Sequence, residues 1–231
     1  KYHNGKRKHV LHSDISFHGK LLGSGTISAS KEVYFKYPQI PNTESFEYNN
    51  IDSVKEKIKK LKKESNESDV YALIIETFQV GTFRICSTEF LKQLQKICNE
   101  NDIVLIFDEI YTGWYKTGHM FNFMGHDVLP DIVTTSKTFG GGKASISAFI
   151  SRTPILKKAY GTNLRDALLH SSTYNGFGEE CITAIEAINI TQEENYEEKC
   201  FNIEKIMKVR CQQLVDNFSD QVKEHRGSGA L

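Results

Sequence analysis

The chain has 231 residues, of which 39% are hydrophobic and 25% are charged, a balance that is ordinary for a folded globular domain. Its 29 Lys and Arg residues are matched by 29 Asp and Glu residues, so charge gives no indication of a nucleic-acid partner or an anionic membrane surface. No apolar run is long enough to cross a bilayer, and the five cysteines form neither a CxxC pair nor a Cys/His cluster of the zinc type. A reduced, cytoplasmic protein without a metal site is therefore expected.

Helical and strand patterns alternate along the chain. The Lys-rich stretch 55–64 predicts a helix with a solvated face, and 87–101 predicts a second helix with one apolar stripe. Helical periodicity returns from residue 179 to about residue 218, with a break near 191–195. Four apolar runs predict strands, at 69–76, 103–110, 131–137 and 145–152. This alternation predicts an α/β layer fold with a largely parallel sheet.

Ionisable residues stand at the ends of the predicted strands. Glu76 ends the first strand, and Asp108 and Glu109 end the second. Lys137 ends the third. Ligands of open α/β sheets bind outside the carboxyl ends of the strands, so these groups are expected to gather at one functional edge. Strand ends are also exposed in general, but here the two carboxylates directly follow a wholly apolar run.

The stretch TTSKTFGGGKAS, residues 134–145, contains Lys137 and three consecutive glycines. It does not match a nucleotide-binding P-loop, because Lys143 is followed by Ala144 and Lys137 occupies the place of the first glycine. A lysine beside Asp108 suits pyridoxal phosphate instead. The amine forms a Schiff base with the cofactor aldehyde, the carboxylate keeps the pyridine nitrogen protonated, and the freed lysine can act as a general base.

Three motifs in order resemble the class III pyridoxal-phosphate aminotransferases. They are LIFDEIYTGWYKTGHMF (105–121), PDIVTTSKTFGGG (130–142) and HSSTYNGFGEEC (170–181). Weaker matches extend the resemblance over nearly the whole chain: SFHGKLLG (16–23), IIETFQVG (74–81) and EHRGSGAL (224–231). The resemblance implies the large domain of a fold-type I transferase, a three-layer αβα structure with a mostly parallel sheet. It also implies pyridoxal 5'-phosphate as cofactor, and transfer of an amino group from an amino donor to a keto or aldehyde acceptor.

The resemblance also assigns roles to matching residues around the cofactor ring. Lys137 is the Schiff-base lysine and Asp108 holds the pyridinium nitrogen. Ile110 packs on one face of the ring and Phe17 stacks on the other, although a core phenylalanine is the alternative interpretation of Phe17. His18, in the same motif as Phe17, is placed among the cofactor-binding residues.

Three further positions follow from the same resemblance. Glu76 matches a glutamate near the cofactor and the substrate. Tyr111 stands where the family often has a glutamine that contacts the ring oxygen of the cofactor, so Tyr111 is expected to bind the cofactor or to shape substrate choice. Thr173 matches a threonine that reaches the cofactor phosphate of the neighbouring subunit, which implies a homodimer with a shared site. The alternative is a polar turn formed by Ser172, Thr173 and Asn175.

Other features leave the function open in part. Tyr115 and Lys116 replace the glycine and arginine that are usual in the family, and Arg84 is either a ligand for a substrate carboxylate or a surface residue. An aminomutase, racemase or decarboxylase would use the same lysine and aspartate, and a non-catalytic relative would act as a binding protein. We expect residues 1–219 to form a cofactor-binding domain that lacks its N-terminal part, and residues 220–231 to begin a smaller domain.

Overall fold

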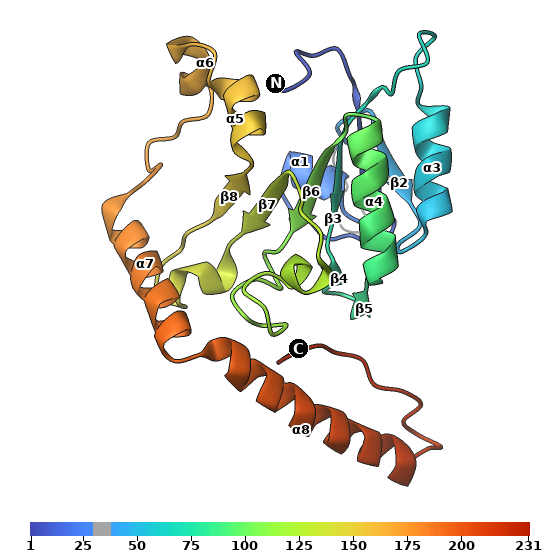
Figure 1. Cartoon of the computed structure of the whole chain (residues 1–231), viewed down its shortest axis with the longest axis vertical. Coiled ribbons are helices and arrows are strands. Elements are labelled where there is room, and N and C mark those ends of the chain that lie inside the picture. Colours follow the sequence, from blue (N-terminus) through green and yellow to red (C-terminus); the bar gives the residue numbers. More distant parts are fainter. Residues whose placement is uncertain (30–37) are drawn as a thin grey trace.

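The computed structural model describes residues 1–29 and 38–231, and its centre is a six-stranded sheet (Figure 1). The strand order is β2–β1–β3–β6–β7–β8, and all neighbours pair in parallel except β7 and β8. The strands are β1 (His9–Ser13), β2 (Thr43–Phe46), β3 (Val70–Ile75), β6 (Val104–Asp108), β7 (Ile132–Thr135) and β8 (Ala148–Ser151). A short antiparallel pair, β4 (Phe78–Gln79) and β5 (Arg84–Ile85), follows β3.

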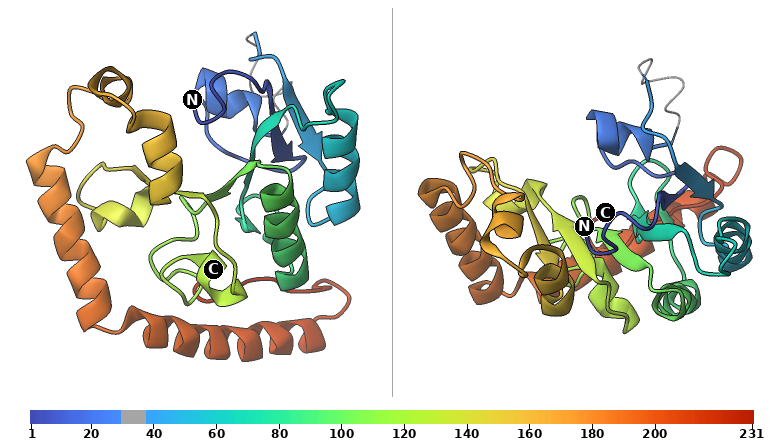
Figure 2. Two further views of the ribbon diagram at one scale, coloured as in Figure 1. Left: turned by 45° about the horizontal axis from the view of Figure 1, so that its top comes forward. Right: turned by 90° about the horizontal axis from the view of Figure 1, so that it is seen from above.

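Helices lie on both sides of this sheet. Figure 2 shows α1 on one side of the strands, and α3 and α4 on the other, while α7 and α8 run along the outside. The α-helices are α1 (Leu22–Thr26), α3 (Ile51–Lys60), α4 (Thr88–Glu100), α5 (Thr153–Tyr160), α6 (Leu164–Leu168), α7 (Gly178–Glu193) and α8 (Tyr196–Asn217). Two 3-10 helices, η1 (Asn122–His126) and η2 (Lys137–Gly140), follow β6 and β7. Among the described residues, no helix is long and apolar enough to cross a bilayer.

The main core lies between the sheet and the pair α3 and α4. Each of the two helices begins at a side-chain cap: Asn50 accepts from the backbone of Asp52 and Ser53, and Ser87 accepts from Phe90. Their apolar stripes pack against strand residues that are almost fully buried. The buried residues of this core include Val54, Ile58, Leu91 and Leu94 from the helices and Leu73, Ile75, Leu105 and Phe107 from the strands. This core fixes β3 and β6, whose carboxyl ends carry two of the predicted site residues.

The predicted fold class is confirmed, and several details differ. The Lys-rich helix begins at Ile51 and ends at Lys60, because the Asn50 cap fixes its start. The third predicted strand ends at Thr135, so Lys137 belongs to η2 instead of β7. Strands β1 and β2 had not been predicted, since HVLHS and TESF carry too many polar residues to be recognised as apolar runs. The predicted break between two C-terminal helices is confirmed at residues 194–195.

Candidate active site

The strand register brings the predicted edge residues together. Ile75 of β3 pairs with Phe107 of β6, so Glu76 and Asp108 follow at the carboxyl ends of adjacent strands. Asp108 pairs with Thr134 of β7, and Lys137 comes three residues later. All three side chains therefore start from the same edge of the sheet, where open α/β folds bind their ligands.

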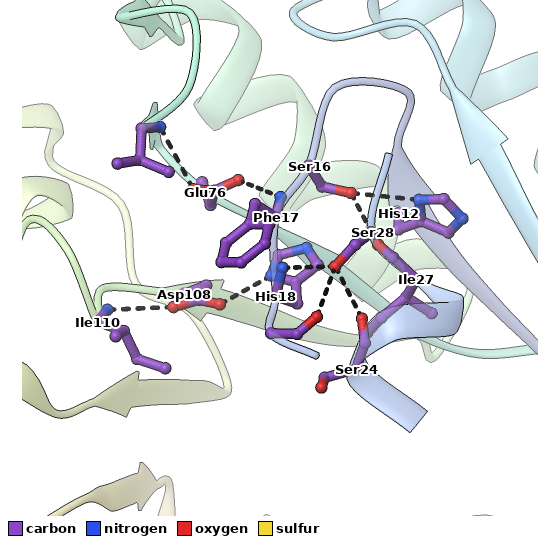
Figure 3. A network of polar contacts seen from close by, with 12 residues as sticks. His12, Ser16, Phe17, His18, Ser24, Ile27, Ser28, Glu76, Asp108 and Ile110 are labelled. Atoms are coloured by element: carbon purple, nitrogen blue, oxygen red, sulfur yellow. Dashed lines mark hydrogen bonds and ion pairs between the residues drawn. The ribbon is translucent and has the colours of Figure 1, made fainter. Parts of the chain in front are cut away.

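Asp108 is buried and held by two hydrogen bonds. Its side chain is 6% exposed, and its Oδ2 accepts from His18 Nδ1 at 2.7 Å (Figure 3). Its Oδ1 accepts from the backbone N–H of Ile110 at 3.1 Å. Each carboxylate oxygen keeps a further lone pair, so Asp108 can accept one more hydrogen bond from a ligand. The His18 side chain is only 2% exposed, so little water competes for this carboxylate.

Glu76 holds the segment that carries Phe17 and His18. Its Oε2 accepts from the backbone N–H of Phe17 at 2.7 Å, and the His18 N–H donates to Ser28 Oγ at 2.9 Å (Figure 3). Burial raises the pKa of Glu76, while His18 and the Phe17 N–H act in the opposite direction. Its role in this structure is to attach residues 16–18 to the end of β3.

Apolar groups flank the buried carboxylate. Phe17 is 42% exposed and Ile110 is half-buried, and Figure 3 shows both beside Asp108, from separate segments of the chain. A large aromatic side chain left this exposed next to a buried, partly satisfied carboxylate can accept a flat ligand. The arrangement fits a pyridinium ring, whose faces are apolar and whose N–H would donate to Asp108. The residues present thus fit the cofactor implied by the sequence motifs.

Lys137 lies on the other side of this edge, beside Tyr111. Its Nζ is 5.3 Å from the centroid of the Tyr111 ring, and Lys116 Nζ is 5.0 Å from the same centroid. Burial, and after it the charge of Lys137, lowers the pKa of Lys116 to about 8. The two lysines are thus close enough to interact electrostatically, and both amines lie near the Tyr111 ring.

The backbone around Lys137 has an unusual conformation. Lys137 has φ 50°, in the left-handed region that few residues with a Cβ adopt, and Gly141 and Gly142 follow with φ 61° and 73°. The two glycines allow the chain to turn a few residues after the lysine. Lys143 is exposed at the surface.

Two predicted residues lie away from this group. Thr173 is exposed in the loop between α6 and α7, and no hydrogen bond or ion pair within the described part of the chain joins it to the Asp108 group. Arg84 lies in β5, with its guanidinium 5.7 Å from the centroid of the Tyr48 ring. Its carbonyl accepts from the Tyr48 hydroxyl, so Arg84 is part of the β4–β5 hairpin.

Glu109 is a buried residue whose partners the sequence did not reveal. Its side chain is fully buried, and its carboxylate accepts from two hydroxyls, Thr77 and Thr112, and two backbone N–H groups, Asn122 and Phe123. Burial raises its pKa to about 7, against the opposing effect of these four donors. Glu109 therefore fixes the loop after β6 and is not exposed at the edge with Asp108. The signal was present in the sequence, since neighbouring residues of a strand point to opposite sides.

Comparison with known proteins agrees with this fold. Solved structures with the same fold include the ornithine aminotransferase from Toxoplasma gondii, at 22% identity and a TM-score of 0.84, with 97% of this chain and 51% of that chain covered. A transaminase from the marine bacterium Virgibacillus matches at 21% identity and a TM-score of 0.81, again with 97% and 51% coverage. This chain thus spans about half the length of those proteins. The family model "Aminotransferase class-III" matches residues 1–231, and the chain therefore belongs to the class III aminotransferases.

Proposed function

We propose that the protein is a pyridoxal-phosphate-dependent aminotransferase that exchanges an amino group between an amino donor and a keto or aldehyde acceptor. The observation that carries this proposal is the Asp108 carboxylate, buried on His18 and flanked by Phe17 and Ile110, at the sheet edge that also bears Lys137. When bound, pyridoxal phosphate supplies an electron sink for the carbanion formed at the amino-bearing carbon of the substrate.

Four residues of this chain would have separate roles around the cofactor. Asp108 would accept the ring N–H and keep the ring protonated, because an opposite charge favours the charged form. His18 holds Asp108 in place by donating from Nδ1. Lys137 would hold the cofactor through its amine, and the same amine would serve as the general base that moves a proton. Glu76 positions the segment with Phe17, so that the aromatic ring lies against the cofactor.

The experiment that tests this proposal is reductive trapping. The protein is incubated with pyridoxal phosphate, reduced with borohydride, digested and mapped by mass spectrometry. The label is expected on the peptide that contains Lys137, and Lys137→Ala is expected to abolish it. Label on Lys143 or Lys116 would overturn the assignment of the lysine, and Lys143→Ala serves as the matched control because Lys143 is exposed and lies six residues away.

The type of reaction is tested separately, with substrates. An aminotransferase exchanges amine between two compounds, so turnover should require both an amino donor and a keto or aldehyde acceptor. Turnover of a single amino compound with no acceptor would identify a mutase, racemase or decarboxylase built on the same residues. Binding of the cofactor without turnover of any amine would support a non-catalytic binding protein.

We also propose a homodimer with a shared site, in which Thr173 binds the cofactor phosphate of the partner. Its exposed position between α6 and α7, away from Asp108 in its own chain, supports this assignment. Mixing Lys137→Ala protomers with Thr173→Ala protomers then gives heterodimers with one intact site, and activity should rise above that of either parent. If Thr173 serves its own chain, every heterodimer site carries a defect and activity should not rise.

The domain layout and the cellular location are proposals of the same kind. Residues 1–219 are assigned to the cofactor-binding domain, and residues 220–231 to the start of a smaller one. All five cysteines are unpaired, which supports a reducing compartment such as the cytoplasm. Expression of a tagged protein and fractionation of cells would test the location.

A further inference from the structure

The backbone of Lys137 needs support from its surroundings. Its φ of 50° is unfavourable for a residue with a Cβ, and such residues persist only where neighbouring contacts determine the conformation. Locally, the Phe139 N–H donates to the Ser136 carbonyl at 3.0 Å, and Ser136 Oγ donates to the Ile146 carbonyl at 3.1 Å. These bonds close the turn, and they connect it to the segment that leads into β8.

One side chain from the loop after β6, Trp114, contacts a residue before Lys137 in the sequence and a residue after it. The indole N–H of Trp114 donates to Thr135 Oγ1 at 2.8 Å, two residues before the lysine. The indole plane stacks on Phe139, two residues after it, with ring centroids 5.1 Å apart and planes at 9°. A single rigid group therefore contacts residues 135 and 139 and spans the turn at Lys137.

Trp114 is itself firmly placed. It is 7% exposed, and its ring meets Phe121 edge to face, with centroids 5.4 Å apart. The loop that carries it is fixed at its far end, where Glu109 accepts from the backbone of Asn122 and Phe123. Movement of Trp114 would break these contacts. The indole therefore holds the turn after β7 in a fixed position relative to β6.

We infer that Trp114 is a positioning residue that holds the backbone of Lys137 in its left-handed conformation and so aims the amine. The inference rests on the proposed function, because it concerns the lysine that carries the cofactor. Without the indole, Lys137 can relax toward ordinary backbone angles. Its amine would then spend less time where pyridoxal phosphate is bound by Asp108.

The test measures how fast the cofactor attaches, not only activity. Apo-protein is mixed with pyridoxal phosphate, samples are reduced with borohydride at set times, and the label on the Lys137 peptide is measured by mass spectrometry. Trp114→Phe keeps the stack on Phe139 but loses the indole N–H, and Thr135→Val removes the acceptor of the same bond. Each is expected to slow attachment about fivefold, and Trp114→Leu, which loses both contacts, more than tenfold.

A matched control separates positioning from stability. Phe46→Leu shortens an aromatic side chain in the same core, on β2 at the opposite edge of the sheet, and its melting temperature is measured beside those of the other variants. The inference is supported if the Trp114 and Thr135 variants attach the cofactor more slowly, while Phe46→Leu is destabilised but attaches it within twofold of the unmodified protein. It is overturned if Trp114→Phe and Thr135→Val attach at the unmodified rate, or if Phe46→Leu slows attachment equally. Label on a lysine other than Lys137 would overturn the proposed function itself, which is a distinguishable result.

Discussion

Replacing Glu109 with glutamine tests how the loop after β6 is held. In the present structure each carboxylate oxygen accepts one backbone N–H and one hydroxyl: Phe123 and Thr77 on Oε1, Asn122 and Thr112 on Oε2. Hydroxyls can rotate and accept a bond instead, but a backbone N–H cannot. Whichever oxygen becomes the amide NH₂ of Glu109→Gln, one backbone N–H is left facing another donor in a fully buried place.

The size of the effect depends on pH. A buried unsatisfied donor costs about 1–3 kcal/mol, so at pH 5.5, where the carboxyl is largely protonated, the variant should be less stable by roughly that amount. Because burial raises the pKa of Glu109 from 4.5 to about 7, the folded protein binds the proton more tightly than the unfolded chain. Its stability is therefore highest at low pH and falls as the pH rises through this range. Between pH 5.5 and pH 8 the loss is about 2 kcal/mol, at about 1.4 kcal/mol per unit. Glutamine does not titrate, so the variant and the unmodified protein should become nearly equal in stability at pH 8.

The measurement is urea unfolding of both proteins at pH 5.5 and pH 8, in the same cofactor state. Glu56→Gln, an exposed position on α3, serves as the control and should follow the unmodified protein at both pH values. The reasoning would be refuted if the destabilisation by Glu109→Gln stayed constant or grew as the pH rose. That result would mean that the four donors, not burial, dominate the ionisation of Glu109.

Three further predictions concern the same end of the sheet. Tyr115 has φ 66° where the family usually has glycine, so Tyr115→Gly should be about 1 kcal/mol more stable than Tyr115→Ala in urea unfolding. The pKa of Lys116 is lowered from 10.5 to about 8, so the unfolded chain binds this proton more tightly and stability rises as pH rises between those values. Lys116→Met should remove that rise, and its gain in stability over the unmodified protein, measured by thermal unfolding, should be larger at pH 7 than at pH 10. Asp108→Asn should lower turnover by about a hundredfold or more, since each 1.4 kcal/mol is tenfold in rate; an effect below threefold in steady-state assays would contradict its role.

The sequence predicted those strands that consist of one continuous apolar run. Strands β3 and β6 lie inside the sheet and consist almost entirely of apolar residues, so the sequence identifies them directly. Strands β1 and β2 depend on partners: β1 carries the buried polar residues His12 and Ser13, and β2 is a short edge strand. Strand β1 pairs with β2 on one side and β3 on the other, so its burial depends on neighbouring segments, and a single-sequence pattern does not contain that information.

The site divides in the same way. Motif resemblance predicted Asp108 as a site residue, but its bond to His18 joins positions that are 90 residues apart in the sequence. The conformation of Lys137 also could not be predicted, because lysine has no intrinsic preference for positive φ. That conformation depends on contacts with Trp114, which no local pattern at residues 134–142 reveals. Motifs therefore predicted which residues gather, and tertiary contacts determine how each is held.

The dipeptide Asp108–Glu109 shows how one strand end can serve both binding and positioning. The Glu109 N–H donates to the Thr134 carbonyl at 3.0 Å, so the chain is still extended there and consecutive side chains point to opposite sides. Asp108 thus faces His18 and the proposed cofactor ring, while Glu109 faces the core and holds residues 122–123. The loop fixed by Glu109 carries Trp114, whose indole contacts both sides of Lys137. Under the proposed function, adjacent carboxylates would therefore act on the two ends of one site, Asp108 at the ring nitrogen and Glu109, through Trp114, at the lysine.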